Sequence, residues 1–318
     1  MPLNVLCFRH DSRAQWAVIR QGATTPIPGD FATTHAFLEA NAIDLLSRLN
    51  GATLREKEIE LLSPITDSQQ FLCQGANCRQ HMIESGLDPD LKTFNMIFTK
   101  APSCLAPANT DVIRPSRVRF LDYEIELGLV LKRNVKSAQS LSAADLHEFV
   151  TGAVIVNDYS ACDVQIPKMQ FYKGKNFRTF GPVGPYLCVL APGDFARLPD
   201  LQWTLTVNGE PRQRDSVANL VYGPAETLSE LSAVQDSPGR RSPLDRDARG
   251  LRFERSLGRQ AAHRRDFAGA AEMAMFMNIQ STLGQYLKLS DVVESHIATS
   301  DGSIDLGVQH NRIVSEAN

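Results

Sequence analysis

The chain has 318 residues, of which 43% are hydrophobic and 22% charged, and its formal net charge is −3. This composition is typical of a globular protein and excludes collagen-like, coiled-coil and wholly disordered chains. The charge gives no electrostatic reason to bind nucleic acid, no apolar run approaches the ~20 residues of a membrane helix, and the start lacks a signal peptide. The sequence therefore predicts a cytoplasmic protein without nucleic-acid or membrane partners.

Residues 1–70 are predicted to form a separate N-terminal α/β unit. Apolar residues recur at helical spacing from Leu38 to Leu49, after a start signal that includes Thr33. A short strand is expected at 58–62, and beyond it the chain changes to short β runs separated by glycine, proline and asparagine. We therefore expect a domain boundary near residue 70, with a second domain over 71–318.

The second domain has the pattern of a strand-rich α+β fold. Residues 123–131 alternate as a strand, and residues 152–156 form a continuous apolar run typical of a strand buried on both faces. A helix is expected between them from Ser142, and another after Pro224. Asn208-Gly209 is a strong two-residue hairpin signal. Strands should dominate this fold.

Three carboxylates form a candidate metal site. Glu124 and Glu126 are two residues apart on a predicted strand, so both side chains leave the same face. Like charges placed together repel, and a divalent cation between them removes the repulsion. Asp158 follows the buried strand and is the candidate third ligand, and such oxygen ligands suit Mg²⁺, Mn²⁺ or Ca²⁺ better than zinc. The alternative interpretation of Glu-x-Glu is a solvated strand face.

Two further motifs carry groups able to move protons or stabilise charge. His81 and Glu84 are neighbours on a helical turn, and a carboxylate beside an imidazole makes a base. The alternative is an exposed helix pair. Lys175 lies in a cationic segment, 173–177, that we expect to be a loop leading into a Gly/Pro turn. Its alternative role is plain surface charge.

The six cysteines occur without Cys-x-x-Cys spacing, so neither a zinc site nor a disulfide framework is expected. Buried, unreactive thiols are the expectation. Cys162 in particular has no adjacent base in the sequence and is not expected to be a nucleophile.

A set of motifs recurs in one order along the chain. They are G-x-N-x-x-x-H-x-x-E from Gly75, F-x-K-x-P-S from Phe98, D-Y-E-x-E-L from Asp122, N-D-Y-S-A-x-D-x-Q from Asn157, K-x-K-x-F from Lys173, T-F-x-P-x-G-P from Thr179 and V-N-G-E from Val207. This ordered set resembles the fumarylacetoacetate hydrolase family over residues 71 to about 235, and more weakly from Tyr286 onwards.

The resemblance implies an α+β, β-dominated fold with a mixed β-roll or barrel-like catalytic domain, a divalent metal, usually Mg²⁺, and a homodimer. It also implies roles for nine residues. These are Glu124, Glu126 and Asp158 as metal ligands, His81 and Glu84 as a dyad on a lid-like helix that handles water or a proton, Lys175 as a catalytic cation, and Gln165, Lys100 and Asn77 as substrate-binding residues.

The function expected from this resemblance is metal-dependent hydrolysis of a carbon–carbon bond in a small 1,3-dicarbonyl or acylpyruvate-like keto acid, in aromatic or amino-acid catabolism. In such a reaction the departing carbon leaves as an enolate, so a metal and a nearby lysine both stabilise charge that grows in the transition state. The alternatives are a hydratase, an isomerase or an oxaloacetate-type decarboxylase on the same fold, and a catalytically impaired family member that only binds small molecules.

The chain departs from the family pattern at three places. Cys162 stands where the S-A-x-D motif usually has arginine, and Cys78 where tyrosine is usual. Residues 237–274 are anomalous: nine arginines and no lysine fall between Arg240 and Arg265, and the family's T-G-T-P motif is missing. Two compensating frameshifts or a divergent insert would explain this segment, which we expect outside the core as a loose basic loop. A nucleic-acid module is a distant alternative.

Overall fold

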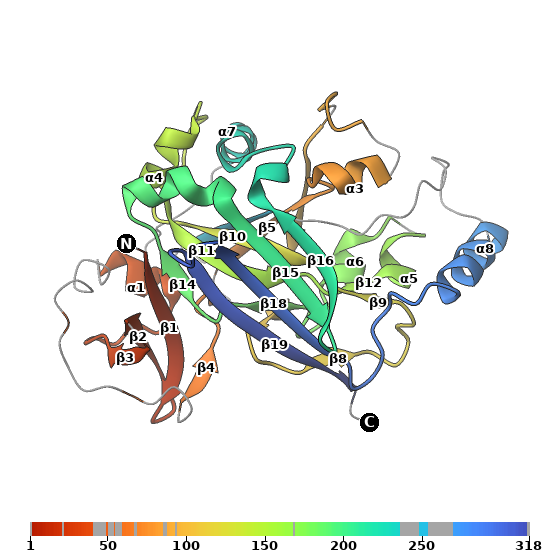
Figure 1. The fold of residues 1–318 in the computed structure, drawn as a ribbon, viewed down its shortest axis with the longest axis horizontal. Coiled ribbons are helices and arrows are strands. Elements are labelled where there is room, and N and C mark those ends of the chain that lie inside the picture. Colours follow the sequence, from red (N-terminus) through yellow and green to blue (C-terminus); the bar gives the residue numbers. More distant parts are fainter. Residues whose placement is uncertain are drawn as a thin grey trace.

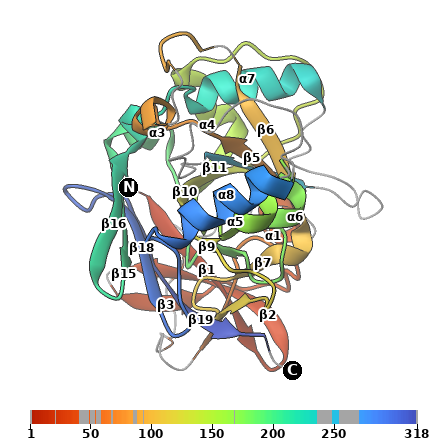
Figure 2. The same ribbon diagram turned by 90° about the vertical axis from the view of Figure 1, so that its right-hand side faces the viewer.

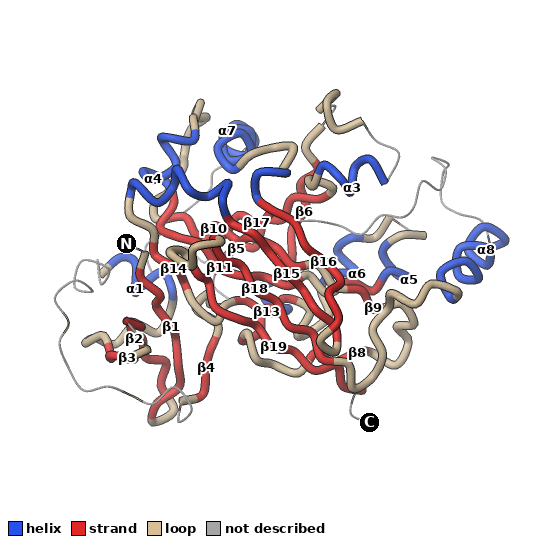
Figure 3. The backbone as a smooth tube through the Cα atoms, in the orientation of Figure 1, coloured by secondary structure: helices blue, strands red, loops and turns tan. Residues whose placement is uncertain are grey.

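Strands are the main secondary structure of the computed structural model (Figures 1 and 3). The structure describes residues 2–20, 22–40, 49, 54, 59–66, 69–84, 88–92, 94–167, 169–235, 248–253 and 270–316. Within these ranges the fold is β-dominated, as the sequence predicts, and no helix is long and apolar enough to span a membrane.

The larger of the two main sheets has the path β3-β2-β1-β14-β11-β10-β17-β5-β6, with β4, β7 and β13 attached to it. Its strands are β1 (Leu3–His10), β2 (Arg13–Arg20), β3 (Ala23–Pro26), β4 (Glu60–Leu62), β5 (Gln69–Gly75), β6 (Met96–Lys100), β7 (Leu105–Pro107), β10 (Ile125–Leu131), β11 (Val150–Asn157), β13 (Gly181–Val183), β14 (Leu187–Val189) and β17 (Ala248–Phe253).

A five-stranded sheet of order β16-β15-β18-β19-β8 and a two-stranded pair, β9 with β12, complete the strands. Their bounds are β8 (Val112–Arg114), β9 (Leu121–Asp122), β12 (Ser160–Ala161), β15 (Leu201–Val207), β16 (Glu210–Ser216), β18 (Val292–Thr299) and β19 (Asp305–Ser315). In β15–β16 the turn residues Asn208 and Gly209 both have positive φ, 53° and 80°, which confirms the predicted hairpin.

The helices are short and lie around the sheets. They are α1 (Thr34–Glu39), α3 (Arg79–Glu84), α4 (Leu146–Phe149), α5 (Cys162–Gln165), α6 (Phe171–Lys175), α7 (Pro224–Val234) and α8 (Ala270–Ser281), with 3₁₀ turns at Pro102–Cys104, Ala143–Asp145, Pro192–Asp200 and Val217–Asn219. Figures 1 and 2 both show α3 and α7 on the same side of the larger sheet.

The two central strands, β10 and β11, are buried on both faces along their whole length, as the apolar run 152–156 predicts. On one face Leu127 and Ile155 belong to the large core shared with the five-stranded sheet. On the other face Val154 and Val156 pack with residues of the N-terminal strands. Because side chains alternate along a strand, Glu126 and Val130 of β10 point toward this N-terminal side as well.

The N-terminal strands continue the larger sheet, since β1 pairs antiparallel with β14. Helix α1 starts where expected, because the Thr33 hydroxyl accepts a hydrogen bond from the Ala36 N–H at 3.1 Å and caps the helix. The expected helix residues 41–48 lie outside the described residues. The division at residue 70 stays a prediction.

One local expectation is wrong: the segment 173–177, expected to be a loop, begins with the last residues of helix α6. The helix expected from Ser142 is present as a 3₁₀ turn followed by α4. It ends at Phe149 because β11 begins at Val150.

The arginine-rich segment is also corrected in part. Six of its residues form β17, which pairs antiparallel with β10 and parallel with β5 in the larger sheet. Backbone hydrogen bonds to two neighbouring strands form this strand, although its sequence shows no strand periodicity. The rest of 237–269 lies outside the described residues.

Candidate active site

The ends of β10 and β11 bring two predicted carboxylates together. The strands are antiparallel with Ile125 opposite Asn157, and the Asp158 N–H donates to the Glu124 carbonyl at 2.8 Å. Glu124 and Asp158 are therefore cross-strand neighbours whose side chains leave the same face. Both are buried, with 3% and 0% exposure.

Glu126 lies on this same face, one step further along the ladder and directly opposite Val156. It is also buried. Beyond it the face becomes apolar, with Gly128 opposite Val154, and a Cβ at Gly128 would come within 2.7 Å of a Val154 methyl group. The i, i+2 spacing thus places both glutamates on one face, and that face is buried rather than solvated.

Lys175 closes the site from helix α6. Its fully buried Nζ donates to Glu124 Oε2 at 2.7 Å, to Asp158 Oδ2 at 2.6 Å and to Ser160 Oγ at 2.9 Å. The preceding Gly174 allows α6 to approach α5 closely, since a Cβ there would lie 2.6 Å from Gln165 Cβ. The lysine is therefore a buried cation and not surface charge.

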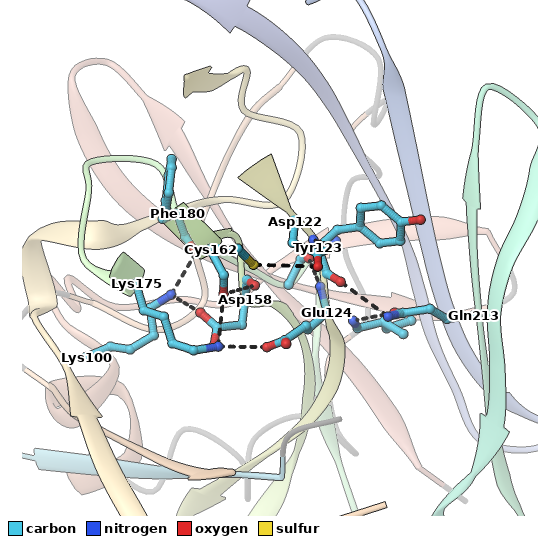
Figure 4. Close-up of polar contacts among 12 residues, drawn as sticks. Lys100, Asp122, Tyr123, Glu124, Asp158, Cys162, Lys175, Phe180 and Gln213 are labelled. Carbon is cyan, nitrogen blue, oxygen red and sulfur yellow. Dashed lines mark hydrogen bonds and ion pairs between the residues drawn. The ribbon is translucent and has the colours of Figure 1, made fainter. Parts of the chain in front are cut away.

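A second buried lysine meets the same aspartate (Figure 4). Lys100, the last residue of β6, donates from Nζ to Asp158 Oδ1 and to the Phe180 carbonyl, the latter at 2.8 Å. Asp158 thus accepts from two ammonium groups, one on each carboxylate oxygen. We call Lys100, Glu124, Asp158 and Lys175 the charged cluster.

Burying such a cluster costs folding free energy, because each charge loses its hydration. Only well-formed ion pairs and hydrogen bonds offset this loss. Networks of buried titratable groups concentrate at functional sites. The charged cluster is therefore the strongest candidate for an active centre in the described chain.

Two neighbours of the cluster were not singled out from the sequence. Ser160, on β12, is the uncharged acceptor of Lys175 and lies opposite Asp122 of β9 in the ladder. Burial raises the pKa of Asp122 to about 7. Both residues stand inside quoted motifs and could have been found there: Asp122 opens D-Y-E-x-E-L, and Ser160 is the serine of N-D-Y-S-A-x-D-x-Q.

Cys162 lies beside Asp122 and donates to Asp122 Oδ2 over 3.7 Å. Burial raises the pKa of the Cys162 thiol well above its ordinary value, so the group stays protonated and is a poor nucleophile. All six cysteines are buried and form no disulfide in this structure.

Gln165, at the end of α5, has a buried side chain that is 7% exposed. Its Oε1 has no hydrogen-bond partner in the described chain. A buried acceptor without a donor is unusual, and here it provides a place for a hydroxyl or water donor.

The dyad residues lie on a helix, as predicted: His81 and Glu84 both belong to α3. Their side chains are outside the described part, so their contacts with the charged cluster stay a prediction. Asn77 is fully buried, and its side chain is hydrogen-bonded to Gln74 and to the Tyr222 backbone. Among the described residues, the Asn77 side chain is hydrogen-bonded to Gln74 and Tyr222 and not to the charged cluster.

The predicted metal ligands fit a hard divalent cation by chemistry, because they offer only carboxylate oxygens. Glu124 and Asp158 already converge on a single cationic atom, Lys175 Nζ. However, within the described ranges no three His, Cys, Asp or Glu side chains are arranged to hold a metal ion. A metal held by Glu124 and Asp158 would therefore need Glu126 as a third ligand. It would also compete with the Lys175 ammonium for the same carboxylate oxygens.

Comparison with known proteins identifies several relatives of this chain. The chain is 35% identical over 179 residues to oxaloacetate tautomerase YisK of Bacillus subtilis, covering 55% of this chain and 57% of that protein. It is 31% identical over 201 residues to 2,4-didehydro-3-deoxy-L-rhamnonate hydrolase of a Sphingomonas species, covering 63% and 67%. This chain thus matches little more than half of the length of the first relative.

A solved structure shows the same fold. The crystal structure of 2-hydroxyhepta-2,4-diene-1,7-dioate isomerase from Mycobacterium marinum superposes with a TM-score of 0.67 at 20% identity, over 99% of this chain and 100% of that one.

Residues 70–238, more than half of the chain, match the family described as fumarylacetoacetate (FAA) hydrolase, C-terminal. The matched range contains the whole charged cluster and stops where the arginine-rich segment begins. The relatives include one protein named a tautomerase and one named a hydrolase. This chain therefore belongs to the fumarylacetoacetate hydrolase family of enzymes.

Proposed function

We propose that this protein hydrolyses a carbon–carbon bond in a 1,3-dicarbonyl or acylpyruvate-like substrate, and that the charged cluster stabilises the enolate of the small 2-oxo acid that leaves when this bond breaks. The observation that carries the proposal is the fully buried ammonium of Lys175, held by Glu124, Asp158 and Ser160. A fixed cation in a water-poor site stabilises negative charge that develops on a substrate oxygen.

Each residue has a task in this scheme. Asp158 and Glu124 orient the Lys175 ammonium, whose positive charge stabilises the developing enolate oxygen. His81, oriented by Glu84, takes a proton from water. The water oxygen then bonds to the carbonyl carbon, the bond between that carbon and its neighbour breaks, and the electron pair passes into the enolate, which is finally protonated. Gln165 Oε1 accepts from a substrate hydroxyl or from the water.

A divalent cation, Mg²⁺ by preference, would be held by Glu124, Glu126 and Asp158, and when bound it supplies Lewis-acid polarisation of the substrate oxygens. The relevant carboxylates come from adjacent strands and share one buried face. This arrangement supports the proposal of metal dependence.

A second candidate function is tautomerisation of a 2-oxo dicarboxylate such as oxaloacetate. It uses the same enolate without attack by water. The 35% identical relative that is named an oxaloacetate tautomerase favours it. The two candidates share the enolate but differ in how it forms: cleavage of the carbon–carbon bond after attack by water releases it in the hydrolase, and removal of a C3 proton produces it in the tautomerase.

One experiment tests the shared step and another separates the outcomes. Exchange of the C3 protons of 2-oxo acids in D₂O, followed by NMR with Mg²⁺ present, measures enolate formation. We expect exchange above the protein-free rate, and a loss of about 10²–10³-fold in Lys175→Met. Lys173→Met, an exposed lysine in the same helix, should keep the wild-type rate.

Product analysis then divides the candidates. Cleavage of an acylpyruvate into two acids supports the hydrolase, whereas interconversion of enol and keto oxaloacetate without cleavage supports the tautomerase. No exchange above the blank with any 2-oxo acid would contradict both.

A further inference from the structure

The residues just before α3 are fastened to a distant part of the chain by a buried clamp. Asn77 Nδ2 donates to the Tyr222 carbonyl at 3.0 Å, and the Tyr222 N–H donates to Asn77 Oδ1 at 2.7 Å. The backbone repeats the connection, since the Val221 N–H donates to the Asn77 carbonyl at 2.8 Å. One side chain therefore pairs with both backbone polar groups of a residue 145 positions away.

The clamp belongs to a larger set of neutral buried groups, Gln74, Asn77, Asn95 and Thr227, which we call the amide network. Gln74 Oε1 accepts from Asn77 at 2.9 Å, while Gln74 Nε2 donates to Asn95 at 2.6 Å and to Thr227 at 3.0 Å. The network thereby ties the end of β5 to β6 and to the first turn of α7. All four side chains are at most 9% exposed.

Helix α3 depends on such contacts. It has only six residues, and isolated helices shorter than ~12–15 residues are marginal in water. Besides the clamp, Cys78 forms a β-bridge with Leu220, and Met82 packs with Val221 and Tyr222. The helix is thus held against one short segment, 220–222, by its preceding residues and by one apolar side chain.

We propose that Asn77 is a positioning residue: its clamp with the Tyr222 backbone sets the place of α3, and thereby of His81 and Glu84, which this helix carries. The inference rests on the proposed function, in which α3 supplies the base. It differs from a role in substrate binding, because both N–H groups of the Asn77 amide already have protein acceptors.

The test compares Asn77→Ala with Asn95→Ala. Asn95 belongs to the same network and is similarly buried, but its bonds go to Gln74, Thr227 and Glu230 rather than to segment 220–222. Both variants remove several buried hydrogen bonds, so both should lose stability. Asn77→Asp, which keeps the acceptor for the Tyr222 N–H but loses both donors, is the second variant if Asn77→Ala does not fold.

Two readouts are needed. Hydrogen–deuterium exchange on peptides covering 76–84 should show protection falling about tenfold or more in the Asn77 variant but not in Asn95→Ala, because only the former frees the start of α3. Under the proposed function, kcat should fall about tenfold or more while KM changes less than twofold.

The outcomes that contradict the clamp differ from the outcome that contradicts the proposed function. A raised KM with unchanged protection of α3 would overturn the clamp and make Asn77 a substrate contact. Equal loss of protection in both variants would overturn it too. Absence of turnover in the wild-type chain would contradict the proposed function alone, and hydrogen exchange would still decide the clamp.

Discussion

The charged cluster and the amide network are both buried and both hydrogen-bonded, but they solve different problems. The network joins neutral groups, so its burial costs little once every donor has an acceptor. The cluster joins four charges, and the attraction between them offsets only part of the free energy lost when they leave water. Buried ion pairs of this kind can often be replaced by apolar residues without loss of stability. Geometry alone explains the amide network, whereas the cluster requires a chemical reason.

The largest expected effect comes from breaking the cluster at its centre. Lys175→Met leaves Glu124 and Asp158 buried with one fewer cation, and removing one partner of a buried ion pair costs about 3–5 kcal/mol. We expect the urea-unfolding free energy to fall by that order, together with the loss of enolate formation. The exposed Lys173→Met variant should change neither quantity, and an unchanged stability in Lys175→Met would show that the ion pairs are not formed in solution.

Asp122, a neighbour of the charged cluster, should make the stability of the protein depend on pH, which the uncharged amide network should not do. Burial raises the pKa of Asp122 from 3.8 to about 7, so the folded protein binds this proton more tightly than the unfolded chain. The stability that Asp122 contributes is fully present below about pH 4 and is lost as the pH rises through 7, with a slope of up to about 1.4 kcal/mol per pH unit. Unfolding of wild type and Asp122→Asn at several pH values between 4 and 7 measures it. Equal slopes in the two proteins would refute the shift.

The neutral network should respond more weakly. Thr227 Oγ1 accepts from both Gln74 and Asn95, and Thr227→Val removes that acceptor at a cost of about 1–3 kcal/mol. Thr206→Val is the matched control, because the Thr206 hydroxyl is buried without a partner in the described chain; its loss should be neutral or stabilising. A similar cost at both positions would mean that the hydrogen bonds accepted by Thr227 do not set the effect.

The smallest expected effect is on metal affinity. Glu126→Gln keeps the shape of the side chain but removes a hard anionic ligand, so calorimetry should show Mg²⁺ binding weakened by about tenfold or more, which corresponds to ~1.4 kcal/mol. The exposed Glu148→Gln, which loses only a surface pair with Arg133, should bind Mg²⁺ like the wild type. Undiminished binding in Glu126→Gln would remove this residue from the proposed ligands.

Much of the fold and site could be predicted from local patterns. Alternation and apolar runs indicated β10 and β11, and Asn208-Gly209 indicated the hairpin, because these signals depend on neighbours in sequence. The even spacing of Glu124 and Glu126 placed both on one face for the same reason. Strand β17 was missed, since its pairing with β5 and β10 comes from backbone bonds to distant strands and leaves no periodic pattern.

The sequence by itself indicated the candidate site residues and placed His81 and Glu84 on a helix, because motif order and spacing are properties of the chain. Only the tertiary structure decided what those residues touch. It placed the Lys175 ammonium between Glu124 and Asp158, paired Lys100 with Asp158, and hydrogen-bonded Asn77 to the Tyr222 backbone. These contacts join segments between 17 and 145 residues apart. Their geometry depends on how β10, β11, α6 and α3 pack, which no local pattern encodes.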